Sequence, residues 1–195
     1  MTQSTTKFPV STNNPCGLDG IDFVEFVSPD PTRLEQLFKA FGFSKTMKHA
    51  QKPVDLFQQG DIAFLINREP RSFAATFGAI HGPSICSMGW RTRDANKASA
   101  AATERGGRIR PEGDYMLDGR PVPAIYGIGD SLIYFVDAYG DPKKWERMGF
   151  EKLANPEMVE GKNFTTIDHL TNNVEKGTMA TWAGFYKRVF GFDEV

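Results

Sequence analysis

The chain contains the same short pattern near both of its ends. Ile21-Asp22-Phe23 is followed by Phe41-Gly42-Phe43, and Ile167-Asp168-His169 is followed by Phe190-Gly191-Phe192. In each copy a strand-like run precedes apolar residues at helical spacing, and a glycine ends the helix. One such unit leaves a sheet face and a sheet edge unburied, so repeated units are expected to share a sheet.

The helix expected in the first copy has clear start and stop signals. Asp30 can cap its first turn, Pro31 suits the first helical position, and Gly42 ends it. Apolar residues recur along one face of this helix, at Leu34, Leu37, Phe38 and Phe41. This apolar stripe needs a sheet to pack against.

A weaker third copy begins near Ile85. A strand is expected at 87–92, followed by a helix at 95–105 that Asp94 can cap. Further runs with strand character lie between these starts, at 54–58, 62–67, 123–127 and 131–137. Each complete unit therefore has the order βαβββ. The sequence predicts an α+β fold in which two such units form one domain over residues 17–138.

Three further segments lie outside this domain, at 1–16, 139–163 and 164–195. Residues 1–16 are expected to be a disordered N-terminal segment, and 139–163, rich in charge with Pro142 and Pro156, a linker. Residues 164–195 start a second domain that ends one strand after its helix. The stripe of that helix, Trp182, Tyr186 and Val189, then lacks strands to cover it. We therefore expect the chain to be a fragment with a truncated second domain.

Composition excludes several classes of partner. The 23 basic and 24 acidic residues nearly cancel and are scattered, which argues against nucleic acid or an anionic membrane as a partner. No stretch approaches the roughly 20 continuous apolar residues of a membrane span, and the start of the chain lacks a signal-peptide core, so a cytoplasmic location is expected. Cys16 and Cys86 are far apart, which favours buried or bystander thiols over a zinc site.

The duplicated βαβββ unit resembles the vicinal-oxygen-chelate superfamily, whose curled sheets present metal ligands on their concave face. A narrower resemblance is to the 4-hydroxyphenylpyruvate dioxygenase family. It runs from about residue 15 to the end of the chain and rests on four motifs: Gly20-Ile21-Asp22-Phe23-Val24-Glu25-Phe26, Phe41-Gly42-Phe43, His81-Gly82-Pro83 and Ile167-Asp168-His169-Leu170-Thr171-Asn172-Asn173-Val174.

This resemblance implies an active site and a reaction. In that family the histidine of the Ile-Asp-His strand is the first of three Fe(II) ligands, which gives this role to His169. The other two ligands, a histidine and a glutamate, are expected beyond Val195. A 2-His-1-carboxylate triad leaves positions open for substrate and oxygen. The implied reaction is the oxidative decarboxylation and ring hydroxylation of 4-hydroxyphenylpyruvate by O2, giving homogentisate in tyrosine catabolism.

The resemblance also implies that the full-length protein is a homo-oligomer, while this chain alone is expected to be inactive. Two alternatives remain open at this stage. Hydroxymandelate synthase has the same fold, iron triad and substrate but oxidises the benzylic carbon. A metal-free binding module of the same superfamily is the second alternative, from a different functional class.

Comparison of the two copies places Phe23 where His169 stands. Phenylalanine cannot bind a metal, so the domain at 17–138 is expected to be non-catalytic. Strand alternation predicts that Ile21, Phe23 and Glu25 share one face.

Other polar residues have structural interpretations. The matched acids Asp22 and Asp168 favour a structural hydrogen bond, because both copies carry them. Asn172 and Asn173 suit a turn between strand and helix. His49 and His81 are expected in surface or turn positions, and the cluster at 143–147 in a solvated linker. Taken without the family, His169 itself would more often be a satisfied buried histidine than a ligand.

Overall fold

The computed structural model describes residue 11 and residues 13–194. A sheet of nine strands has the order β11-β2-β3-β4-β1-β5-β10-β9-β6. Its first unit consists of β1 (Leu18–Val27), α1 (Pro31–Ala40), β2 (Ser44–His49), β3 (Val54–Gln59) and β4 (Ile62–Asn67). Its second unit consists of β5 (Ser84–Thr92), α3 (Ala95–Glu104), β6 (Ile109–Arg110), β9 (Ala124–Tyr126) and β10 (Leu132–Val136).

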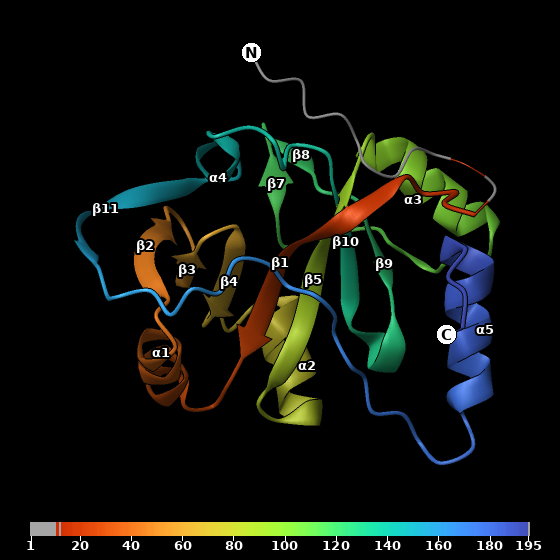
Figure 1. Cartoon of the computed structure of the whole chain (residues 1–195), viewed down its shortest axis with the longest axis horizontal. Coiled ribbons are helices and arrows are strands. Elements are labelled where there is room, and N and C mark those ends of the chain that lie inside the picture. The colour runs from red at the N-terminus through yellow and green to blue at the C-terminus, as the bar shows by residue number, and fades with distance from the viewer. Residues whose placement is uncertain (1–10, 12, 195) are drawn as a thin grey trace.

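The two units have the same internal topology, which confirms the βαβββ prediction. In the first unit β1 runs parallel to β4, and in the second β5 runs parallel to β10. The antiparallel pair β1 and β5 joins the units at the centre of the sheet (Figure 1). Helix α2 (Phe73–His81) connects them, and a small hairpin of β7 (Met116–Leu117) and β8 (Arg120–Pro121) precedes β9. A short 3-10 turn, η1 (Ile128–Asp130), joins β9 to β10.

The helix termini follow the signals in the sequence. The Asp30 carboxylate accepts a hydrogen bond of 3.0 Å from the Arg33 backbone N–H, and Asp94 accepts one of 3.0 Å from Lys97. Helix α5 (Met179–Phe190) ends at Gly191, whose φ of 76° lies in the left-handed region. These three helix ends are therefore predictable from local sequence.

One face of the sheet encloses the main core. Side chains from β2 and β10, which are far apart in the strand order, belong to the same buried cluster, so the sheet is curled around it. Phe23 lies at the centre of this cluster, with its ring centroid 5.9 Å from that of Tyr115, 6.0 Å from Tyr134 and 5.9 Å from Trp145. Aromatic packing of this kind fills the space that a concave binding site would occupy.

Helices α1, α3 and α5 cover the outer face of the sheet, whereas α2 and α4 pack at the edges of the main core. Helix α1 packs Phe38 against Phe57 and Phe64, at ring distances of 5.5 and 5.1 Å. Helices α3 and α5 cover the second half, where Val189 and Phe190 are fully buried. The apolar stripe of α5 is thus partly covered by α3 and the sheet, contrary to the expectation that almost nothing would bury it.

The segment 139–163 is not a solvated linker, and this prediction is wrong for most of its length. It forms α4 (Lys144–Arg147) and β11 (Phe150–Glu157), which pairs antiparallel with β2 at the edge of the sheet. Trp145, Met148 and Phe150 are at most 7% exposed and belong to the main core. Apolar burial and backbone pairing together attach this segment to the first domain.

Two further expectations need correction. Of the predicted disordered segment 1–16, residues 1–10 and 12 lie outside the described residues, but Asn14 and Cys16 are ordered. The Asn14 side chain exchanges hydrogen bonds with the Leu18 backbone, and Cys16 is 3% exposed. The predicted strand at Ile167–His169 is not formed. Among the residues that the structure describes, no strand pairs with this backbone, and a strand needs a partner for its N–H and C=O groups.

A β-bulge in β1 changes the orientation of its side chains. The pairing with β5 shifts between Ile21, opposite Trp90, and Phe23, opposite Gly89. Ile21 therefore packs in the cluster under α3 and α5, while Phe23 lies in the main core. The prediction that Ile21 shares a face with Phe23 is wrong for this reason. None of the helices in the described part of the chain combines the length and the apolar character needed to cross a bilayer.

Candidate functional site

His169 lies on a segment without helix or strand that crosses the sheet between β11 and α5 (Figure 1). The segment is attached at several points. The Val159 backbone N–H donates to the Ser44 hydroxyl at 3.1 Å, and Lys162 donates to the Gln59 side chain. Ile167 and Leu170 anchor it by packing on the apolar clusters of the outer face. His169 thus lies between two apolar anchors.

The His169 ring has one polar partner among the described residues. Its Nδ1 lies 2.7 Å from the carboxylate of Asp168, and the two side chains are 74% and 91% exposed. When Nδ1–H donates to this carboxylate, Nε2 keeps its lone pair for another ligand. This arrangement is common for metal-binding histidines.

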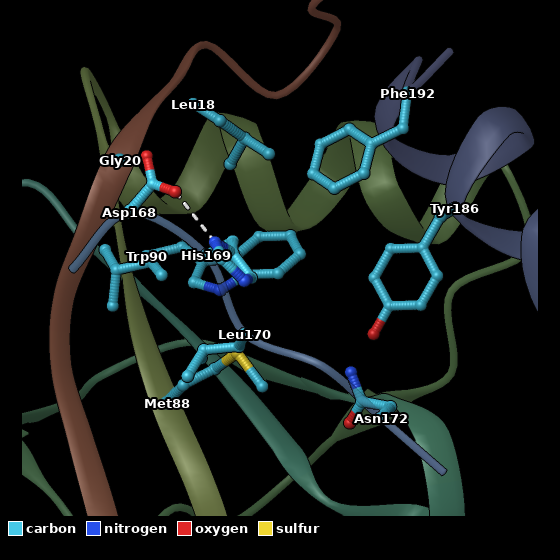
Figure 2. Close-up of a pocket in the computed structure, with 11 residues that line it drawn as sticks. Leu18, Gly20, Met88, Trp90, Asp168, His169, Leu170, Asn172, Tyr186 and Phe192 are labelled. Carbon is cyan, nitrogen blue, oxygen red and sulfur yellow. Dashed lines mark hydrogen bonds and ion pairs between the residues drawn. The ribbon is translucent and has the colours of Figure 1, made fainter. Parts of the chain in front are cut away.

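The ring lines a cavity of about 360 Å³, a size within the range of small-molecule sites. Figure 2 shows His169 near its centre, with Tyr186 and Phe192 on the side of α5. Trp90 of β5 lies 6.2 Å from Tyr186 and 5.8 Å from Phe192, measured between ring centroids. Burial raises the pKa of Tyr186 to about 12, so its hydroxyl is a neutral donor at physiological pH. The cavity is an aromatic one with a polar edge.

The described residues do not fit a metal centre by themselves. Among them no group of three His, Cys, Asp or Glu side chains is arranged to hold an ion. His169 and the adjacent Asp168 provide at most one imidazole and one carboxylate, fewer than an iron facial triad requires. No chemical step through a metal is therefore derived from these residues.

The position matched to His169 in the first domain has a different environment. Phe23 is fully buried, and two residues later the carboxylate of Glu25 is 1% exposed. Its Oε1 accepts hydrogen bonds from Asn67 at 2.7 Å and from the Tyr115 hydroxyl at 2.6 Å, and its Oε2 accepts one from Ser87. The Glu25 carboxylate is thus buried in an aromatic core and hydrogen-bonded at both of its oxygens.

Comparison with known proteins adds to this geometry. Residues 12–151 match the family described as "Hydroxyphenylpyruvate dioxygenase, HPPD, N-terminal". The chain belongs to this family. The HPPD-family chain is 51% identical over 185 residues to "Protein MelA" of Shewanella colwelliana. This alignment covers 95% of this chain and 53% of that protein. It is 40% identical to a 4-hydroxyphenylpyruvate dioxygenase of Legionella pneumophila, over 94% of this chain and 51% of that enzyme.

A solved structure supports the same assignment. A "xylose isomerase-like TIM barrel/4-hydroxyphenylpyruvate dioxygenase fusion protein" superposes with a TM-score of 0.77 at 32% identity, covering 90% of this chain and 28% of that one. The fold is the vicinal-oxygen-chelate fold, as the sequence predicted. The HPPD-family chain spans about half the length of the curated relatives that it matches.

The other histidines have structural surroundings. His49 ends β2, where its ring packs on the edge of Phe150, and burial together with the charge of Lys52 lowers its pKa. His81 is the last residue of α2, where it is exposed, as expected for a surface position, and stacks on Phe77 with the ring centroids 4.1 Å apart. Both cysteines are buried free thiols, in agreement with the prediction.

The matched acids differ from each other. Asp22 is 2% exposed, and its carboxylate lies 2.7 Å from the Lys144 ammonium and 3.5 Å from Arg91 Nε. This confirms a structural role for Asp22, whereas Asp168 is exposed beside His169. Sequence reasoning missed Lys144, because a lysine in a charged segment with prolines is typical of a solvated loop. Its neighbour Trp145 was the available signal for burial.

Replacing Glu25 with glutamine tests the buried network in the HPPD-family domain. Burial raises the pKa of Glu25, against the effect of its hydrogen-bond donors. With a folded pKa above 4.5, the folded state binds more protons than the unfolded chain, so stability falls as pH rises above about 4.5, by up to about 1.4 kcal/mol per pH unit. Glu25→Gln keeps the shape and removes this titration.

We expect Glu25→Gln to be more stable than the parent chain at pH 7. The difference in the free energy of unfolding between the two should become small near pH 4. Chemical denaturation across this pH range measures it. Glu151→Gln, at an exposed position of β11, is the control and should leave the profile unchanged. If Glu25→Gln were less stable than the parent chain at pH 7, burial of the charged Glu25 carboxylate would not be destabilising, and this account would be wrong.

Proposed function

We propose that this chain is the N-terminal part of a 4-hydroxyphenylpyruvate dioxygenase, which converts 4-hydroxyphenylpyruvate and O2 to homogentisate in tyrosine breakdown. The observation that supports this most is the pair Asp168 and His169. The Nδ1···Oδ2 contact of 2.7 Å leaves Nε2 available at the edge of a cavity lined by aromatic rings. Relatives that carry the dioxygenase name align over this histidine segment.

The metal of the proposed enzyme is Fe(II), and His169 is one of its three ligands. The two remaining ligands, a histidine and a glutamate, would come from outside the described residues, which hold no complete set. Iron bound by two histidines and one carboxylate keeps positions open for a chelating α-keto acid and for oxygen.

The two parts of the chain have different roles in this proposal. The domain at 17–138, extended by α4 and β11, is a non-catalytic partner whose interior is filled by Phe23 and its aromatic neighbours. The segment from 164 onward contributes His169 to the catalytic domain. We expect the full-length protein to assemble as a homo-oligomer.

Product analysis of the full-length enzyme tests this function. Incubated with Fe(II), O2 and 4-hydroxyphenylpyruvate, it is expected to release CO2 and homogentisate, identified by chromatography and mass. The isolated 195-residue chain is the matched control, and it should form no product because it lacks a ligand set. 4-Hydroxymandelate as the product would replace the proposal with hydroxymandelate synthase. Binding without turnover would favour a binding module.

A further inference from the structure

A cleft of about 770 Å³ opens between α2 and the strands β6 and β9. Arginine and aromatic side chains line it together, notably Arg108, Arg110, Phe73 and Tyr126. The residues that line this cleft and those around His169 form two sets without a common member. The cleft is therefore not accounted for by the proposed dioxygenase site.

Arg110 is held in a fixed orientation in this cleft. Its Nη1 donates to the Tyr126 hydroxyl at 2.9 Å, and its Nε donates to the backbone carbonyl of Glu112 at 2.7 Å. The guanidinium carbon lies 5.1 Å from the ring centroid of Phe73 and 5.9 Å from that of Tyr126. A guanidinium that is positioned before binding loses less conformational entropy when an anion arrives.

No carboxylate of the described residues lies within ion-pair distance of this guanidinium, and Asp114 acts on it only through its charge at longer range. Asp130 pairs with Arg108, and the Asp114 carboxylate accepts a hydrogen bond of 2.8 Å from the Phe73 backbone N–H. Within the described part of the chain, Arg110 makes no ion pair, and its polar contacts are a phenol and a carbonyl oxygen. A half-buried guanidinium with these partners favours an external anion.

The wall next to Arg110 is apolar. Phe73 and Phe77 lie with their ring centroids 5.7 Å apart, and Ile80, on the same helix, is 74% exposed at the rim. We propose that this cleft binds a small aromatic carboxylate, with the carboxylate paired to Arg110 and the ring packed against Phe73. The planar guanidinium matches a carboxylate in geometry, and the aromatic wall provides the apolar contact.

Three small probes separate the contribution of the carboxylate from that of the aromatic ring. Phenylacetate has both a ring and a charge, acetate has only the charge, and phenylacetamide has the ring without the charge. In calorimetric or NMR titrations of the full chain, phenylacetate is expected to bind at least about tenfold more tightly than either of the others. Equal binding of phenylacetamide, or no binding of phenylacetate at millimolar concentration, would overturn the proposal.

Variants then locate the site. Arg110→Gln is expected to weaken phenylacetate binding by about tenfold or more, because a charge-assisted contact is lost. Tyr126→Phe removes only the hydroxyl that orients Arg110, so it should weaken binding less. Arg120→Gln, an exposed arginine outside this cleft, is the matched control and should bind like the parent. Unchanged binding in Arg110→Gln refutes the assignment.

Two measurements keep this result separate from folding and from the dioxygenase proposal. Thermal unfolding of Arg110→Gln and Tyr126→Phe shows whether each variant is folded at the titration temperature. His169→Ala should bind phenylacetate like the parent, since His169 does not line this cleft. A loss of binding in His169→Ala would place the probe in the other cavity and overturn the proposal.

Discussion

Asp22→Asn is expected to lower the free energy of unfolding by about 3–5 kcal/mol, the usual cost of removing one partner of a buried ion pair. The Asp22 and Lys144 side chains are 1% and 8% exposed, and their charged atoms lie 2.7 Å apart. Asparagine keeps the size of the side chain but leaves the Lys144 ammonium buried without an opposite charge. Denaturant-induced unfolding of the parent chain and the variant measures the difference.

A second substitution separates the effect of the unpaired Lys144 ammonium from any other effect of Asp22→Asn. Lys144→Met in the Asp22→Asn background removes the unpaired ammonium and keeps an unbranched side chain, so the double variant should be more stable than Asp22→Asn alone. Asp130→Asn is the matched control, because its pair with Arg108 is exposed and should contribute less than about 1 kcal/mol. If the stability effects of Asp22→Asn and Lys144→Met, each measured alone, add up to the effect of the double variant, loss of the ion pair is not the cause of the destabilisation.

The same pair gives a pH dependence. Burial lowers the pKa of Lys144 below 10.5, while the charge and the hydrogen bond of Asp22 oppose this shift. In Asp22→Asn this opposition is lost, so the folded pKa falls further. Between that pKa and 10.5 the unfolded chain binds more protons than the folded one, and stability rises with pH. The deficit of the variant should therefore shrink as the pH is raised toward 10, and a constant deficit would contradict this account.

Elements that depend on local signals could be predicted from the sequence. The caps Asp30 and Asp94, the left-handed Gly191 and the strand runs between residues 54 and 137 each involve a few neighbouring residues, and all of them appear in the structure, unlike the strand expected at 167–169. Helix α2 was not predicted because its sequence is mostly apolar without a clear polar face, and it has a glycine in its middle, Gly78, that packs on Val27. Such a helix lacks an amphipathic pattern.

Features that depend on long-range contacts could not be predicted. The bulge that separates Ile21 from Phe23 lies where β5 places Gly89 against the Phe23 ring, at a distance that leaves no room for a Cβ, since an added one would lie 2.3 Å from the ring. Strand β11 is defined by its pairing with β2, and the burial of Lys144 by the distant Asp22. For the candidate site, the sequence and its family resemblance indicated His169, but the aromatic cavity depends on α5 packing beside β5.

On the proposed function, His169→Ala is expected to reduce the turnover of the full-length protein by more than about 100-fold, because loss of the proposed metal ligand should exceed the 10–100-fold effects of residues that only support ligands. The iron content per subunit should fall in parallel. Folding should be little changed, since a side chain that is 74% exposed usually contributes less than about 0.5 kcal/mol. Thermal unfolding of the variant checks this directly.

Phe23→Leu is the matched control, at the corresponding position of the first domain. Phe23 is fully buried among Tyr115, Tyr134 and Trp145, so the smaller side chain should cost on the order of 1–2 kcal/mol of stability. At a temperature where the variant remains folded, its turnover and iron content should match those of the parent. If the His169→Ala variant retained iron and activity, His169 would not be part of the proposed metal site. If the Phe23→Leu variant lost iron while folded, the first domain would have a functional role.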